Sequence, residues 1–196
     1  MSCTVSTART IRSVCVFCSS SDTTRAEIRA TAADLGTCIG KREMRLVYGG
    51  SDMGLMGITA RAALAAGAEV LGIIPRRLAD KVRSLDITEE IIVETMHERK
   101  AAMFAESDVF IALPGGIGTL EETMEMLTWL QLGYSSKPVG ILNADGYYDL
   151  LLQFLDSMVA EQTLKPFHRE MIQVAGQAGT LLDTLAAAGV SYRDKW

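Results

Sequence analysis

Two adjacent carboxylates stand directly behind a glycine-rich stretch in the segment ALPGGIGTLEE, residues 112–122. Glycines allow backbone turns that are closed to residues with a Cβ, and they let a ligand approach the backbone closely. The helix expected next begins with unpaired N–H groups and a positive dipole end, which favour a bound phosphate. Thr119 can cap this helix or donate to the same anion. We therefore expect a phosphate-binding loop made of Gly115, Gly116, Ile117, Gly118 and Thr119.

The alternative for this segment is a tight turn followed by a capped helix, for which one glycine would suffice. No lysine follows Gly118 as it would in a P-loop, which argues against that motif. A buried strand expected before the glycines and a helix expected after them favour the phosphate site.

Glu121 and Glu122 fall in the first turn of that helix, where the dipole stabilises a carboxylate. This structural role alone would account for both residues. The functional alternative is that a carboxylate beside a bound phosphate binds sugar hydroxyls, orients a water molecule or stabilises a developing cation.

The helix expected at 119–132 has apolar residues on more than one side. One stripe, expected to face the core, contains Leu120, Met124 and Leu127. Other large apolar residues lie partly outside that stripe: Met126, Trp129 and Leu132. We therefore expect the helix to bury a second face against another copy of the chain, as a homodimer or a higher homo-oligomer.

A second charged cluster is MHERK, residues 96–100, at the start of another expected helix. The dipole disfavours cations there, so Arg99 and Lys100 suggest that an anion lies nearby. A solvated charged face is the alternative. His97 is a candidate proton donor by position only, and an exposed or structural histidine is the simpler interpretation.

Apolar runs typical of strands recur along the chain, at 11–17, 45–48, 69–74, 90–94, 108–113 and 137–142. Helical patterns lie between and after them, at 24–40, 54–68, 96–107, 119–132, 147–162 and 179–189. Continuous apolar strands that alternate with helices are typical of a parallel sheet covered on both faces. The sequence thus predicts an α/β fold, a Rossmann-like doubly wound parallel sheet in a single domain at 12–190.

Ligands of such sheets bind at the carboxyl ends of the strands. Three loops rich in Gly or Ser are expected there: FCSSSD at 17–22, YGGSDMGLMG at 48–57 and LPGGIGT at 113–119. Together they would build a pocket lined by backbone N–H groups and suited to an anion.

Composition limits the function classes. The chain has 196 residues and a net charge of −5, which argues against a nucleic-acid surface, and no apolar run is long enough to span a membrane. With two histidines and no clustered ligands, neither a metal nor a pyridoxal cofactor is expected. Residues 1–11 are expected to form a disordered tail, with an organelle-targeting remnant as the alternative, and we expect a cytoplasmic location. Cys15 and Cys18 form a CxxC inside an apolar strand pattern, so we interpret them as small core residues.

The motifs YGGSDMGLMG, MHERK and PGGIGTLEE, in this order and spacing, resemble the Lonely Guy (LOG) family over residues 12–175. The family consists of cytokinin-activating phosphoribohydrolases, long mislabelled as lysine decarboxylases. The resemblance implies hydrolysis of the N-glycosidic bond of an N6-substituted adenosine 5′-monophosphate, which gives the free base and ribose 5-phosphate, without a cofactor. Ser19 and Ser51 stand where the family commonly has glycine.

The resemblance also implies roles for single residues. Arg99 and Glu122 match the catalytic pair of the family. Its nucleotide-binding positions are matched by the 115–119 loop together with Lys100, Glu121 and Thr128. Two rival functions stay open: a general AMP nucleosidase, which would differ in the base pocket, and a non-catalytic nucleotide or molybdenum-cofactor carrier, which would not need Arg99 and Glu122.

Overall fold

A computed structural model describes residues 10–81 and 85–188 of the chain. Its seven strands form one sheet in the order β4-β3-β2-β1-β5-β6-β7, and every neighbouring pair is parallel. The strands are β1 (Ser13–Phe17), β2 (Arg45–Tyr48), β3 (Val70–Pro75), β4 (Glu89–Val93), β5 (Val109–Ala112), β6 (Val139–Leu142) and β7 (Ile172–Ala175). The parallel sheet confirms the predicted fold class.

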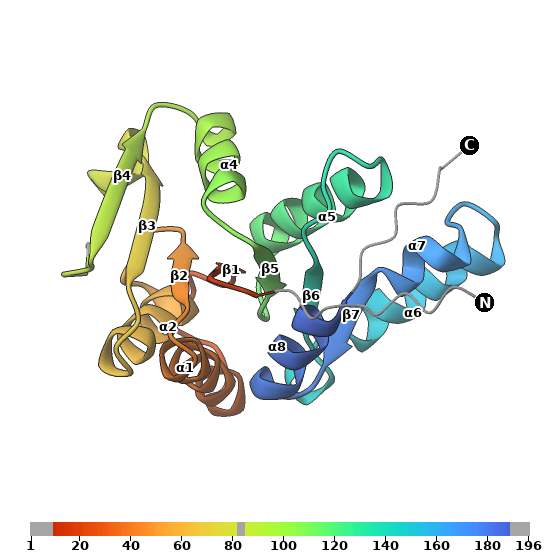
Figure 1. Ribbon diagram of the computed structural model, residues 1–196, viewed down its shortest axis with the longest axis horizontal. Helices are drawn as coiled ribbons and strands as arrows, with labels where there is room; N and C mark the ends of the chain where they lie inside the picture. Colours follow the sequence, from red (N-terminus) through yellow and green to blue (C-terminus); the bar gives the residue numbers. More distant parts are fainter. Residues whose placement is uncertain (1–9, 82–84, 189–196) are drawn as a thin grey trace.

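Helices cover both faces of this sheet (Figure 1). On one side lie α1 (Ala26–Lys41), α2 (Gly54–Ala65) and α8 (Ala178–Ala187), and on the other lie α4 (Met96–Ala105) and α5 (Ile117–Gln131). The remaining helices are short or lie towards the β7 edge: α3 (Arg76–Ala79), η1 (Ala144–Gly146), α6 (Asp149–Ala160) and α7 (Pro166–Glu170). Among the described residues, no helix is both long and apolar enough to cross a membrane.

The central strand β1 shows why its residues are apolar at every position. Val14 and Val16 pack into the cluster formed with α1, α2 and α8, whereas Cys15 and Phe17 pack into the cluster formed with α4 and α5. Side chains alternate between the two faces of a strand, so a strand covered on both faces must be apolar throughout.

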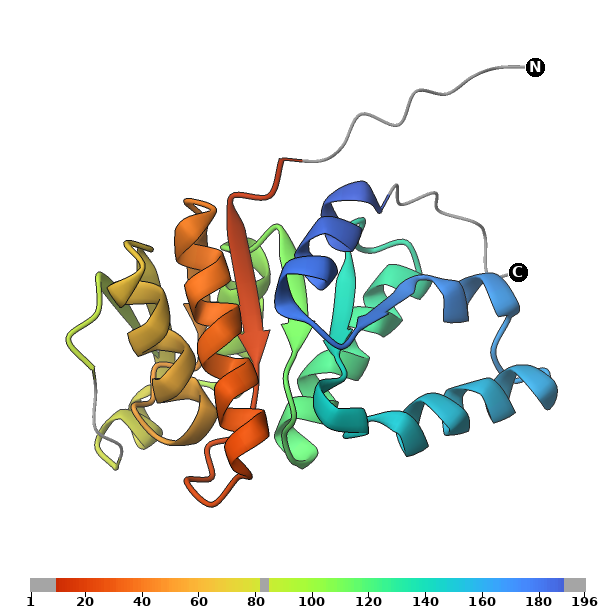
Figure 2. The same cartoon turned by 90° about the horizontal axis from the view of Figure 1, so that it is seen from below.

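The order of the strands reverses between β1 and β5. The chain builds β1 to β4 outward in one direction, then returns across the sheet through α4 to place β5 on the other side of β1. Loops at the carboxyl ends of β1 and β5 therefore diverge and leave a crevice between them. Figure 2 shows the β1 arrow pointing to the edge of the sheet where this crevice lies.

Close packing of α1 on α2 sets the position of the loop before α2. A Cβ at Gly36 would collide with the carbonyl oxygen of Thr59, and one at Gly40 would lie 2.5 Å from the Cβ of Ala66. Glycines at these two positions allow the helices to approach more closely than larger residues would permit.

Several elements differ from the sequence-based expectation. The strand β7 and the short helices α3 and α7 were not among the predicted runs. The predicted inward stripe of α5 is right only in part. Leu120 and Leu127 are half-buried against the core clusters, but the fully buried residues of this helix are Thr119, Glu122, Thr123, Met126 and Leu130. Residues 1–9 of the expected tail lie outside the described part of the chain, and Ile11, which that tail included, is buried in the core.

Candidate active site

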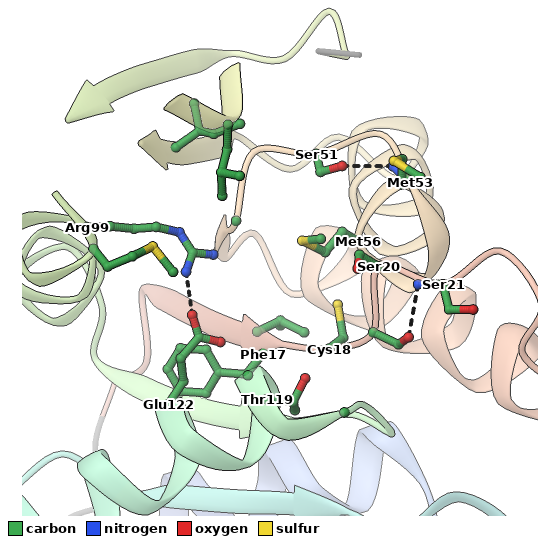
Figure 3. A pocket seen from close by; sticks show the side chains of 18 residues that line it. Phe17, Cys18, Ser20, Ser21, Ser51, Met53, Met56, Arg99, Thr119 and Glu122 are labelled. Carbon is green, nitrogen blue, oxygen red and sulfur yellow. Dashed lines mark hydrogen bonds and ion pairs between the residues drawn. The ribbon is translucent and has the colours of Figure 1, made fainter. Parts of the chain in front are cut away.

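A pocket of about 470 Å³ opens at the carboxyl ends of β1, β2 and β3 (Figure 3). All three loops expected to form the ligand site contribute to it. Its walls come from residues 16–21, from the stretch 49–56, and from the start of α5, and Arg99 of α4 lies on a further side. The fold thus brings together segments that lie up to about a hundred residues apart in the sequence.

A buried ion pair joins two walls of the pocket. Arg99 donates from its Nη1 to Glu122 Oε1, and the two side chains are only 10% and 12% exposed. The Arg99 Nε also donates to the carbonyl of Ile73 at the end of β3, at 3.0 Å. These contacts fix the guanidinium between the sheet and α5, with its positive charge facing the carboxylate on the wall of the pocket (Figure 3).

Gly49 makes room for the guanidinium. A Cβ at this position would lie 2.5 Å from Arg99 Nη2 and 2.8 Å from the sulfur of Met56. Gly49 belongs to the glycine-rich loop YGGSDMGLMG, whose residue types alone do not indicate this role. The role depends on the approach of Arg99 from α4, and the sequence does not show that these two residues are in contact.

The pKa of Glu122 is raised above its ordinary value because burial disfavours the charged form, and the nearby Arg99 opposes this rise. A charge buried without its partner would be costly, so the ion pair is what permits a carboxylate at this depth. The ion pair with Arg99 thus favours the charged form of Glu122 against the effect of burial.

Lys100 faces the same helix one position further on. Its ammonium pairs with Glu121 and, at 3.0 Å, with Glu125, and only 12% of the Lys100 side chain is exposed. The anion that the sequence predicts near Arg99 and Lys100 is therefore, in this structure, a set of carboxylates on α5. Lys100 and Glu121 are not among the residues that line the large pocket.

The start of α5 keeps its backbone N–H groups available. The described structure gives this helix no side-chain cap, and a Cβ at Gly116 or Gly118 would meet nothing within 4 Å. Gly116, Gly118 and Thr119 line the pocket, and Gly115 lies too close to the Thr119 side chain to carry a Cβ. These features fit an anion at this end of the pocket.

The start of α2 differs, although it reaches the same pocket. Asp22 Oδ1 accepts from the N–H of Gly54 at 2.7 Å, and Ser51 Oγ accepts from the N–H of Met53 at 3.1 Å. Ser19 adds its carbonyl, which accepts from the N–H of Leu55 at 2.9 Å. Because protein groups already satisfy these donors and one of them is a carboxylate, a phosphate is disfavoured here.

Apolar side chains from the start of α2, the end of β3, α3 and the start of α4 line another part of the pocket. This part is formed by the side chains of Met53, Met56, Ile74, Leu78 and Met96. Thioether and aliphatic groups make a flat or irregular apolar surface that accommodates an aromatic ring. The pocket therefore has an apolar end, an end with free N–H groups, and an ion pair between α4 and α5.

Other predicted residues lie apart from this pocket. Ile117 is 83% exposed, and Thr128 lies exposed further along α5, with its hydroxyl donating to the carbonyl of Met124 at 2.7 Å. His97 is exposed and does not line the pocket, which gives it no contact with a ligand there.

The two cysteines of the CxxC lie in different environments. Cys15 is fully buried, as expected of a core residue, whereas Cys18 lines the pocket. Burial raises the pKa of both thiols, so neither is a reactive thiolate. Among the described residues, no group of three or more His, Cys, Asp and Glu side chains is placed to hold a metal ion.

The chain is similar to a known protein family over most of its length. Residues 56–185 match a family model described as possible lysine decarboxylase. A cytokinin riboside 5′-monophosphate phosphoribohydrolase of Arabidopsis thaliana is 47% identical over 189 residues, which cover 93% of this chain and 83% of that protein. Another from the same plant is 46% identical over 175 residues, covering 89% and 81%.

Solved structures resemble the chain in fold. The molybdenum cofactor binding protein from the phototrophic bacterium Rippkaea orientalis superposes with a TM-score of 0.69 at 22% identity, covering 89% of this chain and 94% of that one. At this identity the likeness concerns the fold alone.

The buried pair predicts a pH-dependent stability. In an Arg99→Gln variant, burial acts on Glu122 without opposition, so its pKa rises further above the unfolded value. A carboxyl group whose pKa is raised in the folded state stabilises the protein at pH values below its unfolded pKa. This stabilisation is lost as the pH rises through the folded pKa. We expect a loss of about 3–5 kcal/mol in the free energy of unfolding at pH 8, and a smaller loss near pH 5, measured by urea denaturation.

The double variant Arg99→Gln/Glu122→Gln is the control, because it contains neither charge. It should be more stable than Arg99→Gln at pH 8 and should show no such gain towards pH 5. A single variant whose loss is the same at both pH values would contradict the buried-charge explanation.

Proposed function

The chain belongs to the Lonely Guy family of cytokinin riboside 5′-monophosphate phosphoribohydrolases, and we propose that it hydrolyses the N-glycosidic bond of an adenosine 5′-monophosphate. The products are the free base, adenine or its N6-substituted form, and ribose 5-phosphate. The observation that carries this proposal is the buried Arg99–Glu122 pair in a pocket that also receives the uncapped start of α5.

The two ends of the pocket orient such a nucleotide. Its 5′-phosphate fits the free N–H groups at the start of α5, next to Gly116, Gly118 and Thr119. Its base fits the apolar end near Met53 and Met56. In this orientation the ribose lies between the two ends, beside the ion pair.

The reaction requires charges of both signs. A water oxygen bonds to C1′ while the C1′–N bond breaks, so positive charge develops on the sugar and negative charge on the leaving base. Glu122 can stabilise the sugar cation or accept the proton of the attacking water. Arg99 can stabilise the departing base or bind the phosphate, but its permanent charge makes it a poor proton donor.

Lys100 supports this arrangement from beside the pocket. We propose that Lys100 and Glu121, which match nucleotide-binding positions of the family, act in the substrate complex after their present ion pair rearranges. Their mutual contact, together with that of Lys100 to Glu125, holds α4 against α5 and thereby keeps Arg99 opposite Glu122.

A carrier of nucleotides or of the molybdenum cofactor is the alternative. It shares the fold, and the glycine loops alone would serve it. It has no use for a buried cation and carboxylate facing each other inside the ligand pocket, and the two Arabidopsis thaliana relatives are named as phosphoribohydrolases. These two observations favour the enzyme.

The purified protein tests the proposal directly. We expect it to release free base from AMP, from N6-isopentenyladenosine monophosphate, or from both, detected by chromatography. Isopentenyladenosine without its phosphate should be a very poor substrate, because binding energy at the phosphate is used in the transition state. A folded protein that binds AMP and releases base from neither nucleotide would favour the carrier.

Glu122→Gln keeps the shape of the side chain and removes its charge. If Glu122 faces the reacting sugar, kcat should fall by about 10²–10³-fold while AMP still binds. Glu125→Gln is the matched control, since Glu125 lies one turn further along α5 and pairs with Lys100. It should lose far less. A Glu122→Gln enzyme whose kcat lies within threefold of the wild-type value would exclude a catalytic role.

We also propose that the protein is at least a homodimer. The sequence suggests a second apolar face on α5 that includes Met126, but Met126 is only 3% exposed and belongs to the core of its own chain. Exposed apolar residues instead occur at Leu150 and Phe154, one turn apart on α6, with 80% and 62% exposure. Glu121 and Thr128, outside the pocket of their own chain, lie on α5 where a partner can reach them.

Light scattering at micromolar concentration should give about twice the 21.2 kDa mass of the chain. Leu150→Glu should lower the mass towards the monomer, because a charge in an apolar interface opposes its burial. Ala30→Glu, on the exposed side of α1 across the sheet, is the control and should leave the mass unchanged. A monomeric wild-type protein would contradict the proposal.

A cytoplasmic location is proposed as well. The three cysteines in the described part of the chain are free thiols, which is usual for proteins of a reducing compartment.

A further inference from the structure

A short motif after β6 reaches the loop that precedes α5. It reads NADGYYD, residues 143–149, and contains the 3-10 turn η1 and the start of α6. Since β6 pairs with β5 in the register Ala112↔Ile141, the loops that follow these two strands emerge side by side at the carboxyl edge of the sheet. The motif lies outside the residues assigned so far to substrate binding or catalysis.

The backbone of this motif is built to turn sharply. Asp145 and Gly146 both have positive φ, +51° and +68°, and a Cβ at Gly146 would lie 2.6 Å from the Asp149 carboxylate. Asn143 closes the turn: its Oδ1 accepts from the N–H of Tyr148 at 2.7 Å, and its Nδ2 donates to Asp149 at 2.7 Å. The turn sends two consecutive tyrosines back towards the loop before α5.

Both tyrosine hydroxyls donate to carbonyls of that loop. Tyr148 donates to the carbonyl of Leu113 at 2.7 Å, and Tyr147 donates to the carbonyl of Gly115 at 2.8 Å. The rings contact each other edge to face, with centroids 4.9 Å apart. Burial raises the pKa of the Tyr148 hydroxyl, which therefore stays protonated as a donor.

With these bonds, every carbonyl from 113 to 116 has a donor. The Pro114 carbonyl accepts from the N–H of Ser19 at 3.1 Å, and the Gly116 carbonyl accepts from the N–H of Leu120 at 3.1 Å. The tyrosines thus supply the two donors that neither the first loop nor the helix provides.

The direction of the carbonyls determines the direction of the N–H groups. In a trans peptide unit the C=O and the N–H point opposite ways, and the described residues contain no cis peptide bond. The bond from Tyr147 to the Gly115 carbonyl therefore turns the N–H of Gly116 away from Tyr147. Gly116 lines the pocket, and no atom lies within 4 Å of the place where its Cβ would be, so the N–H of Gly116 borders open space in the pocket.

We propose that Tyr147 is a positioning residue for the phosphate site: its hydroxyl holds the Gly115 carbonyl so that the N–H of Gly116 faces the ligand. Tyr148 anchors the start of the same loop through the Leu113 carbonyl, whose peptide unit ends in Pro114 and has no N–H to orient. The inference rests on the proposed function for the identity of the ligand, a phosphorylated ribose. Neither tyrosine is among the residues that line the pocket, so both act through the backbone of residues 113–116.

Tyr147→Phe is the sharpest test, because it removes one hydroxyl and keeps the ring. Calorimetry should show the Kd for ribose 5-phosphate raised by about 3- to 10-fold, the range for one lost hydrogen bond. The Kd for adenine, which occupies the other end of the pocket, should change by less than about twofold. In steady-state assays with AMP, KM should rise by a similar factor, with a smaller change in kcat.

Tyr134→Phe is the matched control, since Tyr134 is 77% exposed beyond the far end of α5. It should leave both dissociation constants unchanged. Tyr148→Phe should lower the melting temperature, because it leaves the buried Leu113 carbonyl without its donor. It should raise the Kd for ribose 5-phosphate less than Tyr147→Phe does, because the Leu113–Pro114 peptide unit has no N–H.

Two results would overturn the inference. One is a Tyr147→Phe protein whose Kd for ribose 5-phosphate lies within twofold of the wild-type value. The other is an equal weakening of ribose 5-phosphate and adenine, which would indicate a general loosening of the fold. A wild-type protein that binds ribose 5-phosphate but releases no base would overturn the hydrolase alone, and the binding measurements would still decide the role of the tyrosines.

Discussion

The burial of one ion pair constrains much of this structure. A carboxylate as deep as Glu122 needs a cation at contact distance, because a buried charge without a partner is costly. Arg99 can reach it only if α4 and α5 lie on the same face of the sheet, and only if residue 49 lacks a Cβ. The Arg99 Nε also donates a hydrogen bond to the carbonyl of Ile73 near the end of β3. Two helices, a strand end and a loop are thus fixed relative to one another by two side chains.

The topology of the sheet places this ion pair on the wall of a pocket. Because the strand order reverses between β1 and β5, the loops after these strands separate, and both lead towards helix N-termini at the pocket. A pair placed elsewhere on α4 and α5 would be a structural bridge between helices, as Lys100 with Glu125 is. At the switch point it becomes a pair that a ligand can reach.

Sequence patterns predict the fold well and the side-chain contacts less well. Strands buried on both faces are apolar at nearly every position, which makes the five inner strands recognisable. The edge strand β4 is largely exposed, and its apolar run IIV alone identifies it, whereas β7, with the half-exposed pattern IQVA, shows no such run. The loops of the pocket could be predicted because glycine and serine mark backbone that approaches a ligand. The most buried face of α5 differs from the predicted stripe for a physical reason. This helix buries a charged residue, Glu122, and hydrophobicity alone does not predict the Arg99 partner on another helix.

The two helix starts at the pocket illustrate how the same backbone feature acquires opposite roles. Both α2 and α5 follow glycine-containing loops at the carboxyl edge of the sheet. At α2 the first N–H groups are occupied by Asp22, Ser51 and the backbone of Ser19, so the dipole is already compensated by protein oxygens. At α5 the donors are left free, and the carbonyls behind them are held instead by tyrosines and by the first loop. The asymmetry gives the pocket a direction, because the α5 end is suited to an anion and the apolar end is suited to a ring.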